Sequence, residues 1–126
     1  MTASDGGPSR DPRVYFAAER TLLAWIRTGI AIMAFGFVVA RFGLFLRLMH
    51  VQAGGVAPEP GVSPYLGAGL VLLGVVSTAL GALEYRRYCR QLPAVDLPTP
   101  RATLFPLLLA AALVSAGLVL VVALLR

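Results

Sequence analysis

The chain has no lysine, a single cysteine, a single histidine, and six acidic residues against eleven arginines. One cysteine excludes a disulfide framework within the chain, so Cys89 is expected to be a free thiol. With one histidine, His50, no metal cluster or cysteine–histidine nucleophile pair can be built from one copy. The sequence therefore predicts no catalytic residues, no metal site and no cofactor, and the chain is not expected to be an enzyme.

Charge is also missing from long stretches of the sequence. Of 126 residues, 58% are hydrophobic and 13% charged, and the mean hydropathy is +0.80. Apolar runs cover residues 22–46 (interrupted by Arg27 and Arg41), 65–83 and 103–125. Each can cross about 30 Å of hydrocarbon at about 1.5 Å per residue, and a single span in lipid must be helical. These runs predict an all-α integral membrane protein with three transmembrane helices.

The segments before the first run are polar or amphipathic. Residues 1–10 are predicted to be a disordered tail, and residues 11–126 to be the three-helix membrane domain. Asp11 and Pro12 suit a helix start. A straight helix over residues 12–46 would be about 50 Å long, more than one crossing needs. Residues 12–20 are therefore expected to form a short interfacial amphipathic helix with a bend before the span, and no cleavable signal peptide is recognised.

The arginines are distributed unevenly between the two ends of the predicted spans. One side has seven: Arg10, Arg13, Arg20, Arg86, Arg87, Arg90 and Arg101. The other has three: Arg41, Arg47 and Arg126. Because positive residues remain inside, the N-terminus is predicted to be cytoplasmic and the C-terminus outside. The net charge of +5 then reflects topology, and no nucleic-acid partner is expected.

Arg20 and Arg27 share one narrow face of the first predicted span. The same face carries Ala24, Ala31, Ala34 and Val38, at 100° per residue. Two interpretations remain open for Arg27, which lies about two turns into the span. Its guanidinium could reach back to phosphate headgroups, or it could face a water-filled cavity or an oligomer axis where an anion neutralises it.

Two carboxylates near the basic end, Glu19 and Glu84, are predicted to form structural ion pairs. Glu19 has no basic residue three or four positions away, so its partner is expected elsewhere: Arg86, Arg87, Arg90 or a neighbouring subunit. Simple solvation of Glu19 at the headgroups is the alternative. Glu84 and Arg87 have the spacing of an ordinary i,i+3 pair on a helix.

Two sets of glycines repeat every seven residues. They are Gly29, Gly36 and Gly43 in the first run, and Gly67, Gly74 and Gly81 in the second. Missing side chains on one stripe let helices approach closely and associate inside lipid. The repeats predict tight helix packing, either within one subunit or between subunits.

The stretch VYFAAERTLLAWIRTGIAIMAFGFVVARFG, residues 14–43, resembles the YidH-like bacterial inner-membrane family, a domain-of-unknown-function group numbered 202. The hallmark of that family is Asn-Glu-Arg-Thr-Phe-Leu-Ala-Trp-(Ile/Leu)-Arg-Thr. It matches Glu19 to Thr28, except that Leu22 replaces the phenylalanine, and Ala18 replaces the asparagine before it. The resemblance implies a three-span protein of the bacterial plasma (inner) membrane.

The same domain is similar to the membrane part of the eukaryotic vacuolar transporter chaperone complex, where three-helix subunits form a ring associated with polyphosphate synthesis and passage. This similarity implies a homo-oligomer of about five copies. It places Arg13 and Arg20 at the mouth of a path, beside Arg86, Arg87 or Arg90. The role of Arg27 follows from the stripe alone, and the absence of a polymerase domain excludes polyphosphate synthesis by this chain.

Two functional hypotheses follow for this membrane protein. The first is an oligomer with an arginine-lined axis that binds or conducts an inorganic anion such as polyphosphate. The second is a non-conducting accessory subunit, whose glycine stripes dock a membrane partner and whose arginines bind anionic lipid. Both predict the same topology, and they differ in subunit number and in what Arg27 contacts.

Overall fold

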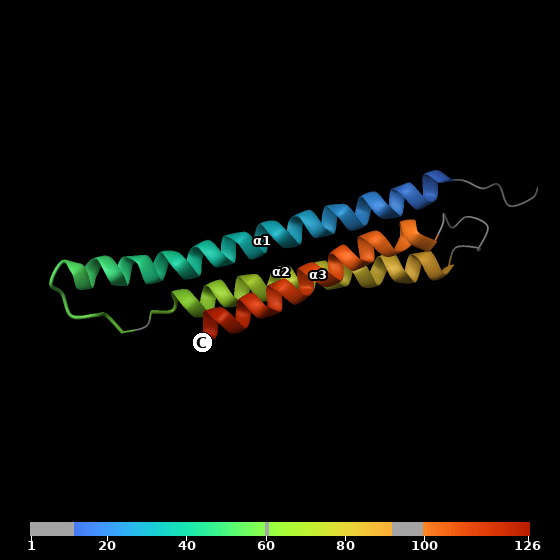
Figure 1. Ribbon diagram of the computed structural model, residues 1–126. Coiled ribbons are helices and arrows are strands. Elements are labelled where there is room, and N and C mark those ends of the chain that lie inside the picture. Colours follow the sequence, from blue (N-terminus) through green and yellow to red (C-terminus); the bar gives the residue numbers. More distant parts are fainter. Residues whose placement is uncertain (1–11, 60, 92–99) are drawn as a thin grey trace, which may run out of the picture.

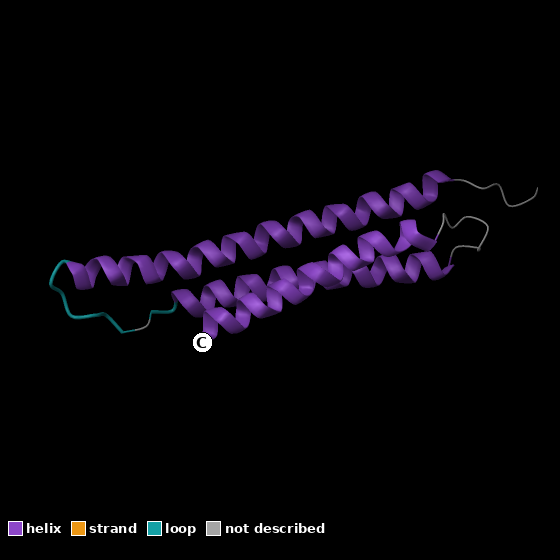
Figure 2. Cartoon of the chain, in the orientation of Figure 1, coloured by secondary structure: helices purple, strands orange, loops and turns teal. Residues whose placement is uncertain are grey.

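The chain folds into three long helices that pack side by side (Figure 1). A computed structural model describes residues 12–59, 61–91 and 100–126. The helices are α1 (Pro12–Gln52), α2 (Ser63–Gln91) and α3 (Pro100–Leu125), and no strand occurs in those ranges (Figure 2). All three are long and apolar enough to cross a membrane, which confirms the predicted fold class. The disordered tail predicted for residues 1–10 lies outside the described residues.

The first helix differs from the expectation at its N-terminal end. Residues 12–20 form no separate helix before the span, because α1 continues without interruption from Pro12 to Gln52 over 41 residues. No glycine or proline stands between Pro12 and Gly29 to end the helix. In addition, Leu22 and Ile26 are buried against Tyr85 of α2 and Ala110 of α3. Ala18, before the expected bend, packs against the same cluster, so packing on both sides of the bend favours one helix of about 60 Å.

The ends of the helices follow from local sequence. After Gln52, Gly54 adopts φ +83°, a left-handed conformation that glycine tolerates without steric cost. The Gly54 N–H donates to the Val51 carbonyl and the Gly55 N–H to the His50 carbonyl, both at 3.1 Å. This is the Schellman arrangement, which satisfies the last carbonyls of α1. At the other connection, Pro100 begins α3, where its missing N–H costs no helical hydrogen bond.

The glycine repeats pack α1 directly on α2 within one subunit. A Cβ on Gly36 would stand 2.6 Å from the Gly67 carbonyl oxygen, and one on Gly74 the same distance from the Gly29 oxygen. The remaining two contacts are between Gly43 and Ser63, and between Gly81 and Trp25. All six glycines therefore lie where the two helices touch, and the close backbone approach is a feature of the subunit itself.

The third helix closes the bundle against both partners and buries two apolar clusters. Near the basic end, Ala110 packs with Leu22, Ile26 and Tyr85. Further along, Val114, Leu120, Val121 and Leu124 pack on Met33, Val71 and Val75. The outward face of α3 exposes large apolar side chains, as a lipid-facing helix does. Its exposed members include Leu104, Phe105, Leu108, Val119 and Val122.

One hydroxyl links two helices, and its removal should weaken the bundle. The Ser63 hydroxyl at the start of α2 donates to the Val39 carbonyl of α1 at 2.7 Å. Ser63→Ala is expected to lower the free energy of unfolding by about 0.5–1.5 kcal/mol, measured by thermal unfolding in detergent. Ser115→Ala is the matched control, because the Ser115 hydroxyl bonds the Ala111 carbonyl of its own helix. Equal effects of the two variants would show that the inter-helix bond contributes nothing.

Candidate functional site

The predicted arginine stripe lies on the outer surface of the subunit. Arg20, Ala24, Arg27, Ala31, Ala34 and Val38 are all exposed. The opposite face of α1, with Leu22, Ile26, Gly29, Met33, Gly36 and Ala40, is buried against the other helices. The stripe therefore points away from α2 and α3. Neither Arg20 nor Arg27 makes a hydrogen bond or ion pair within the described ranges.

The packing of α3 on α1 shows where Arg27 lies along the bundle relative to the candidate span of α3. Helices α1 and α3 run in the same direction (Figure 1), and a Cβ on Gly117 would stand 3.1 Å from the Met33 sulfur. With that pair level, Leu104, the first residue of the α3 span, is level with Arg20. Arg27 then lies seven residues, about 10 Å, further along the bundle than the level of Arg20 and Leu104, and inside the candidate span Phe16–Gln52 of α1. A guanidinium at this depth needs a partner or a path to the headgroups.

The remaining predicted arginines gather at the end of the bundle where α1 begins and α2 ends (Figure 1). Arg13, Arg86, Arg87 and Arg90 are all exposed. Arg87 pairs with Glu84 at 3.8 Å, one helical turn away, as the spacing predicts. Both side chains of this pair are largely exposed, so the pair contributes little to stability. The structure thus brings two helix ends of the same charge together at one end of the bundle.

Glu19 does not pair with any of these arginines within the part of the chain that the structure describes. It is half-buried and lies seven residues before Ile26, on the face of α1 that packs into the bundle. The predicted ion pair between Glu19 and the end of α2 is therefore not formed in a single subunit. A neighbouring copy stays available as its partner.

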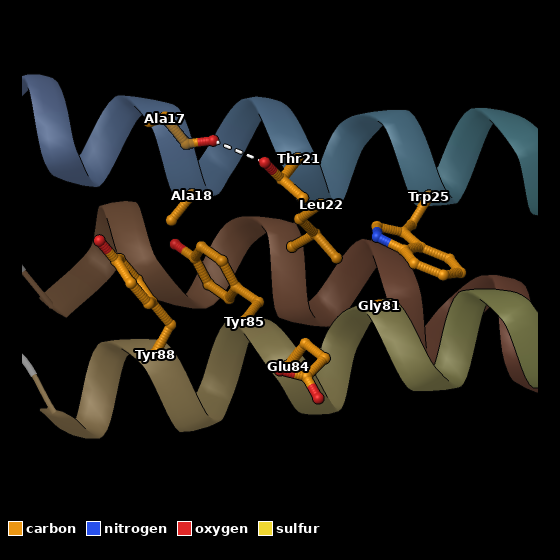
Figure 3. A pocket seen from close by; sticks show the side chains of 9 residues that line it. All are labelled: Ala17, Ala18, Thr21, Leu22, Trp25, Gly81, Glu84, Tyr85 and Tyr88. Carbon is orange, nitrogen blue, oxygen red and sulfur yellow. Dashed lines mark hydrogen bonds between the residues drawn. The ribbon is translucent and has the colours of Figure 1, made fainter.

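A cavity of about 300 Å³ opens between α1 and α2 at the basic end (Figure 3). Its walls are mostly apolar or aromatic, and Tyr85 and Tyr88 point from α2 toward α1. Glu84 turns away from α1, and the Thr21 hydroxyl donates to the Ala17 carbonyl at 3.0 Å. The lining residues are Ala17, Ala18, Thr21, Leu22, Trp25, Gly81, Glu84, Tyr85 and Tyr88. Glu84 is the charged side chain among these lining residues, and no arginine is among them.

The sequence reasoning missed the two tyrosines of this cavity. A usable signal was present, because Tyr88 continues the heptad of Gly67, Gly74 and Gly81 along the contact face of α2. The side chains of residues 19–28 in α1 are also divided between two faces of the helix. Leu22 and Trp25 face α2, whereas Arg20 and Arg27 face outward. No group of three or more His, Cys, Asp or Glu side chains with metal-binding geometry occurs among the described residues.

Comparison with known proteins identifies the family of this chain. The chain is 32% identical over 106 residues to the uncharacterized proteins MT2333 and Rv2272 of Mycobacterium tuberculosis, strains CDC 1551 and H37Rv. The match covers 79% of this chain and 74% of each relative. No solved structure matches the chain. A family model matches residues 13–91, which contain α1, the glycine contact and α2. The chain therefore belongs to the family described as domain of unknown function (DUF202).

Proposed function

We propose that the chain forms a homo-oligomer in the bacterial plasma membrane, with the outward face of α1 lining an axis that binds or conducts anions. Arg27 is the observation that carries this proposal. It is exposed, inside the candidate span Phe16–Gln52 of α1, and without a partner in the described part of its subunit. Facing lipid there is costly for a charge, and an anion shared between neighbouring copies offsets that cost. The proposed function involves no catalysis.

The distribution of small residues supports assembly through the stripe. Ala24, Ala31 and Ala34 stand between or beside the arginines on the exposed face of α1, and small side chains allow helices of different copies to approach closely. An accessory subunit docked through its glycine stripes would need those glycines at its surface. They are instead used in the α1–α2 contact. This favours the oligomer over the accessory role, and the resemblance to the vacuolar complex suggests polyphosphate as the anion.

The mass of the intact assembly in lipid nanodiscs tests the proposal directly. Native mass spectrometry is expected to show one closed ring, of about five copies by the family resemblance. Ala31→Leu should disperse the ring, because the added side chain separates neighbouring α1 helices. Ala112→Leu, the same substitution on an exposed face of α3, should leave the ring intact. A monomeric wild type would end the proposal, because three packed helices enclose no pore, and would support the accessory role.

The proposed orientation places α2's basic end in the cytoplasm. In a Cys89→Ser background, a membrane-impermeant maleimide applied to intact cells is expected to label Ala57→Cys but not Asp96→Cys. Ala57 lies in the connection after α1, and Asp96 falls between Gln91 and Pro100 in the sequence. The expectation rests on the excess of arginine at the α2 end. Labelling with the opposite pattern would invert the topology and assign the stripe to the outer half of the membrane.

A further inference from the structure

A second cavity lies at the other end of the bundle from Arg20. There α1 extends past the first turn of α2 and the end of α3 (Figure 1). The cavity has a volume of about 620 Å³ and is enclosed by α1, the connection after it, the start of α2 and the end of α3. It is distinct from the stripe, because it opens on the packing face of α1. No prediction from the sequence pointed to it.

The side chains around this cavity carry an excess of positive charge. Arg41, Arg47 and Arg126 line it, with Glu59 as its single acidic side chain. None of the three arginines forms an ion pair within the described residues. The Arg41 guanidinium stands 5.6 Å from the centre of the Phe37 ring, which holds it by a cation–π contact without neutralising it. Three guanidiniums near one carboxylate form an anion-attracting site.

Arg47 is positioned for a ligand. It continues the heptad of Ile26, Met33 and Ala40, three residues that are buried on the packing face of α1. Arg47 therefore lies beside the start of α2 and the end of α3. Its Nε is buried and has no hydrogen-bond partner among the residues that the structure describes. Buried polar groups in proteins are nearly always satisfied, so an unsatisfied Nε in the cavity wall is unusual, and the same guanidinium carries further N–H groups that can reach an acceptor.

Other parts of the cavity wall also favour an anion that carries an apolar group. Helix α2 begins at the cavity wall, so the positive end of its dipole also favours an anion. Leu44, Leu124 and Leu125 add an apolar wall. Arg41 is level with Leu125, the last residue of the α3 span, by the pairing of Met33 with Gly117. Arginines that flank apolar helix segments are typical of the headgroup region, where lipid phosphates stand.

We infer that this cavity is a binding site for a phosphate group, held by Arg41, Arg47 and Arg126. The phosphate belongs either to the headgroup of an anionic lipid, with its chains on the apolar wall, or to a soluble phosphate compound. The inference does not depend on the proposed anion axis, which uses the opposite face of α1. Guanidinium groups bind phosphate through paired N–H donors, and Arg47 stands in the cavity wall without a partner among the described residues.

The test compares ligand binding by full-length wild type, Arg47→Gln and Glu59→Gln. In phosphatidylcholine nanodiscs with added phosphatidylglycerol, native mass spectrometry counts retained anionic lipid. In pure phosphatidylcholine nanodiscs, inorganic phosphate and pyrophosphate are titrated against thermal stability. Arg47→Gln is expected to weaken binding by about tenfold or more. Glu59→Gln, the control of opposite charge in the same cavity, should leave binding equal or tighter.

The outcomes separate the two sources of phosphate and expose a failure. Loss confined to phosphatidylglycerol identifies a lipid site, and loss confined to phosphate or pyrophosphate identifies a soluble ligand. Arg47→Gln should fold normally without ligand, because its Nε has no partner to lose; Arg41→Gln serves as a second loss variant. If neither arginine variant changes binding of any of these ligands, or if Glu59→Gln weakens binding equally, the site does not exist.

Discussion

Gly36→Ala is expected to lower the free energy of unfolding by about 1–3 kcal/mol, the usual range for an overpacked contact. The new Cβ would stand 2.6 Å from the Gly67 carbonyl oxygen and 2.8 Å from the Val71 nitrogen. Both are backbone atoms, so no side chain can rotate away and the helices must separate. Gly36→Leu should prevent α1 and α2 from packing at all. Thermal and denaturant unfolding in detergent, followed by circular dichroism, measures both effects.

Gly69→Ala provides the matched control on the second helix. Gly69 is exposed, and a Cβ there would meet nothing within 4 Å. Alanine favours a helix over glycine by up to about 1 kcal/mol, so this variant should be neutral or more stable. The same propensity acts at Gly36, yet the steric cost there is expected to exceed it. Equal stability changes at the two positions would mean that the close approach of α1 and α2 contributes nothing.

Arg27→Leu is expected to reduce anion passage through proteoliposomes by at least about tenfold, while insertion and assembly survive. The substitution removes the charge that attracts the anion inside the span and leaves the contacts of α1 with α2 and α3 unchanged, because Arg27 is exposed. Flux of inorganic phosphate and of short-chain polyphosphate into the vesicles is the measurement. Native mass spectrometry of the same sample reports whether the assembly remains.

Arg27→Lys is the control that keeps the charge. An ammonium attracts the anion but lacks the planar fork of a guanidinium, so flux should fall only severalfold. Unchanged flux in Arg27→Leu would remove Arg27 from the path. If flux is absent in the wild type and Arg27→Leu instead alters lipid preference, the guanidinium binds headgroups.

Several features of the fold could be predicted from the apolar runs and from the spacing of particular residues. Uncharged runs of this length require helices in lipid, so three spanning helices followed directly. The heptad repeats that contain Gly36 and Gly67 indicated close helix contact. The i,i+3 spacing of Glu84 and Arg87 indicated their ion pair. The expected bend near Arg20 was wrong, because bilayer thickness alone was used to limit a helix whose packing on Tyr85 and Ala110 continues past that point.

The candidate sites depended more on tertiary structure. Periodicity placed Arg20 and Arg27 on one face of a helix, but it could not say whether that face is turned toward α2, α3 or the outside. The cavity around Arg47 was invisible for a similar reason, because the end of α3 meets α1, the connection after it and the start of α2 only in the folded bundle. Only the relative lengths of the helices, with α1 extending past its neighbours, create it (Figure 1).

The sequence by itself determined that the chain crosses a membrane as three helices and that small residues would mediate close contacts. These properties depend on local composition and period, which one segment carries alone. The tertiary structure decided that the glycines pack α1 on α2 inside one subunit, that Arg27 faces away from it, and that Glu19 has no arginine partner there. Those outcomes depend on the rotation and offset of each helix relative to the others, which no single helix encodes.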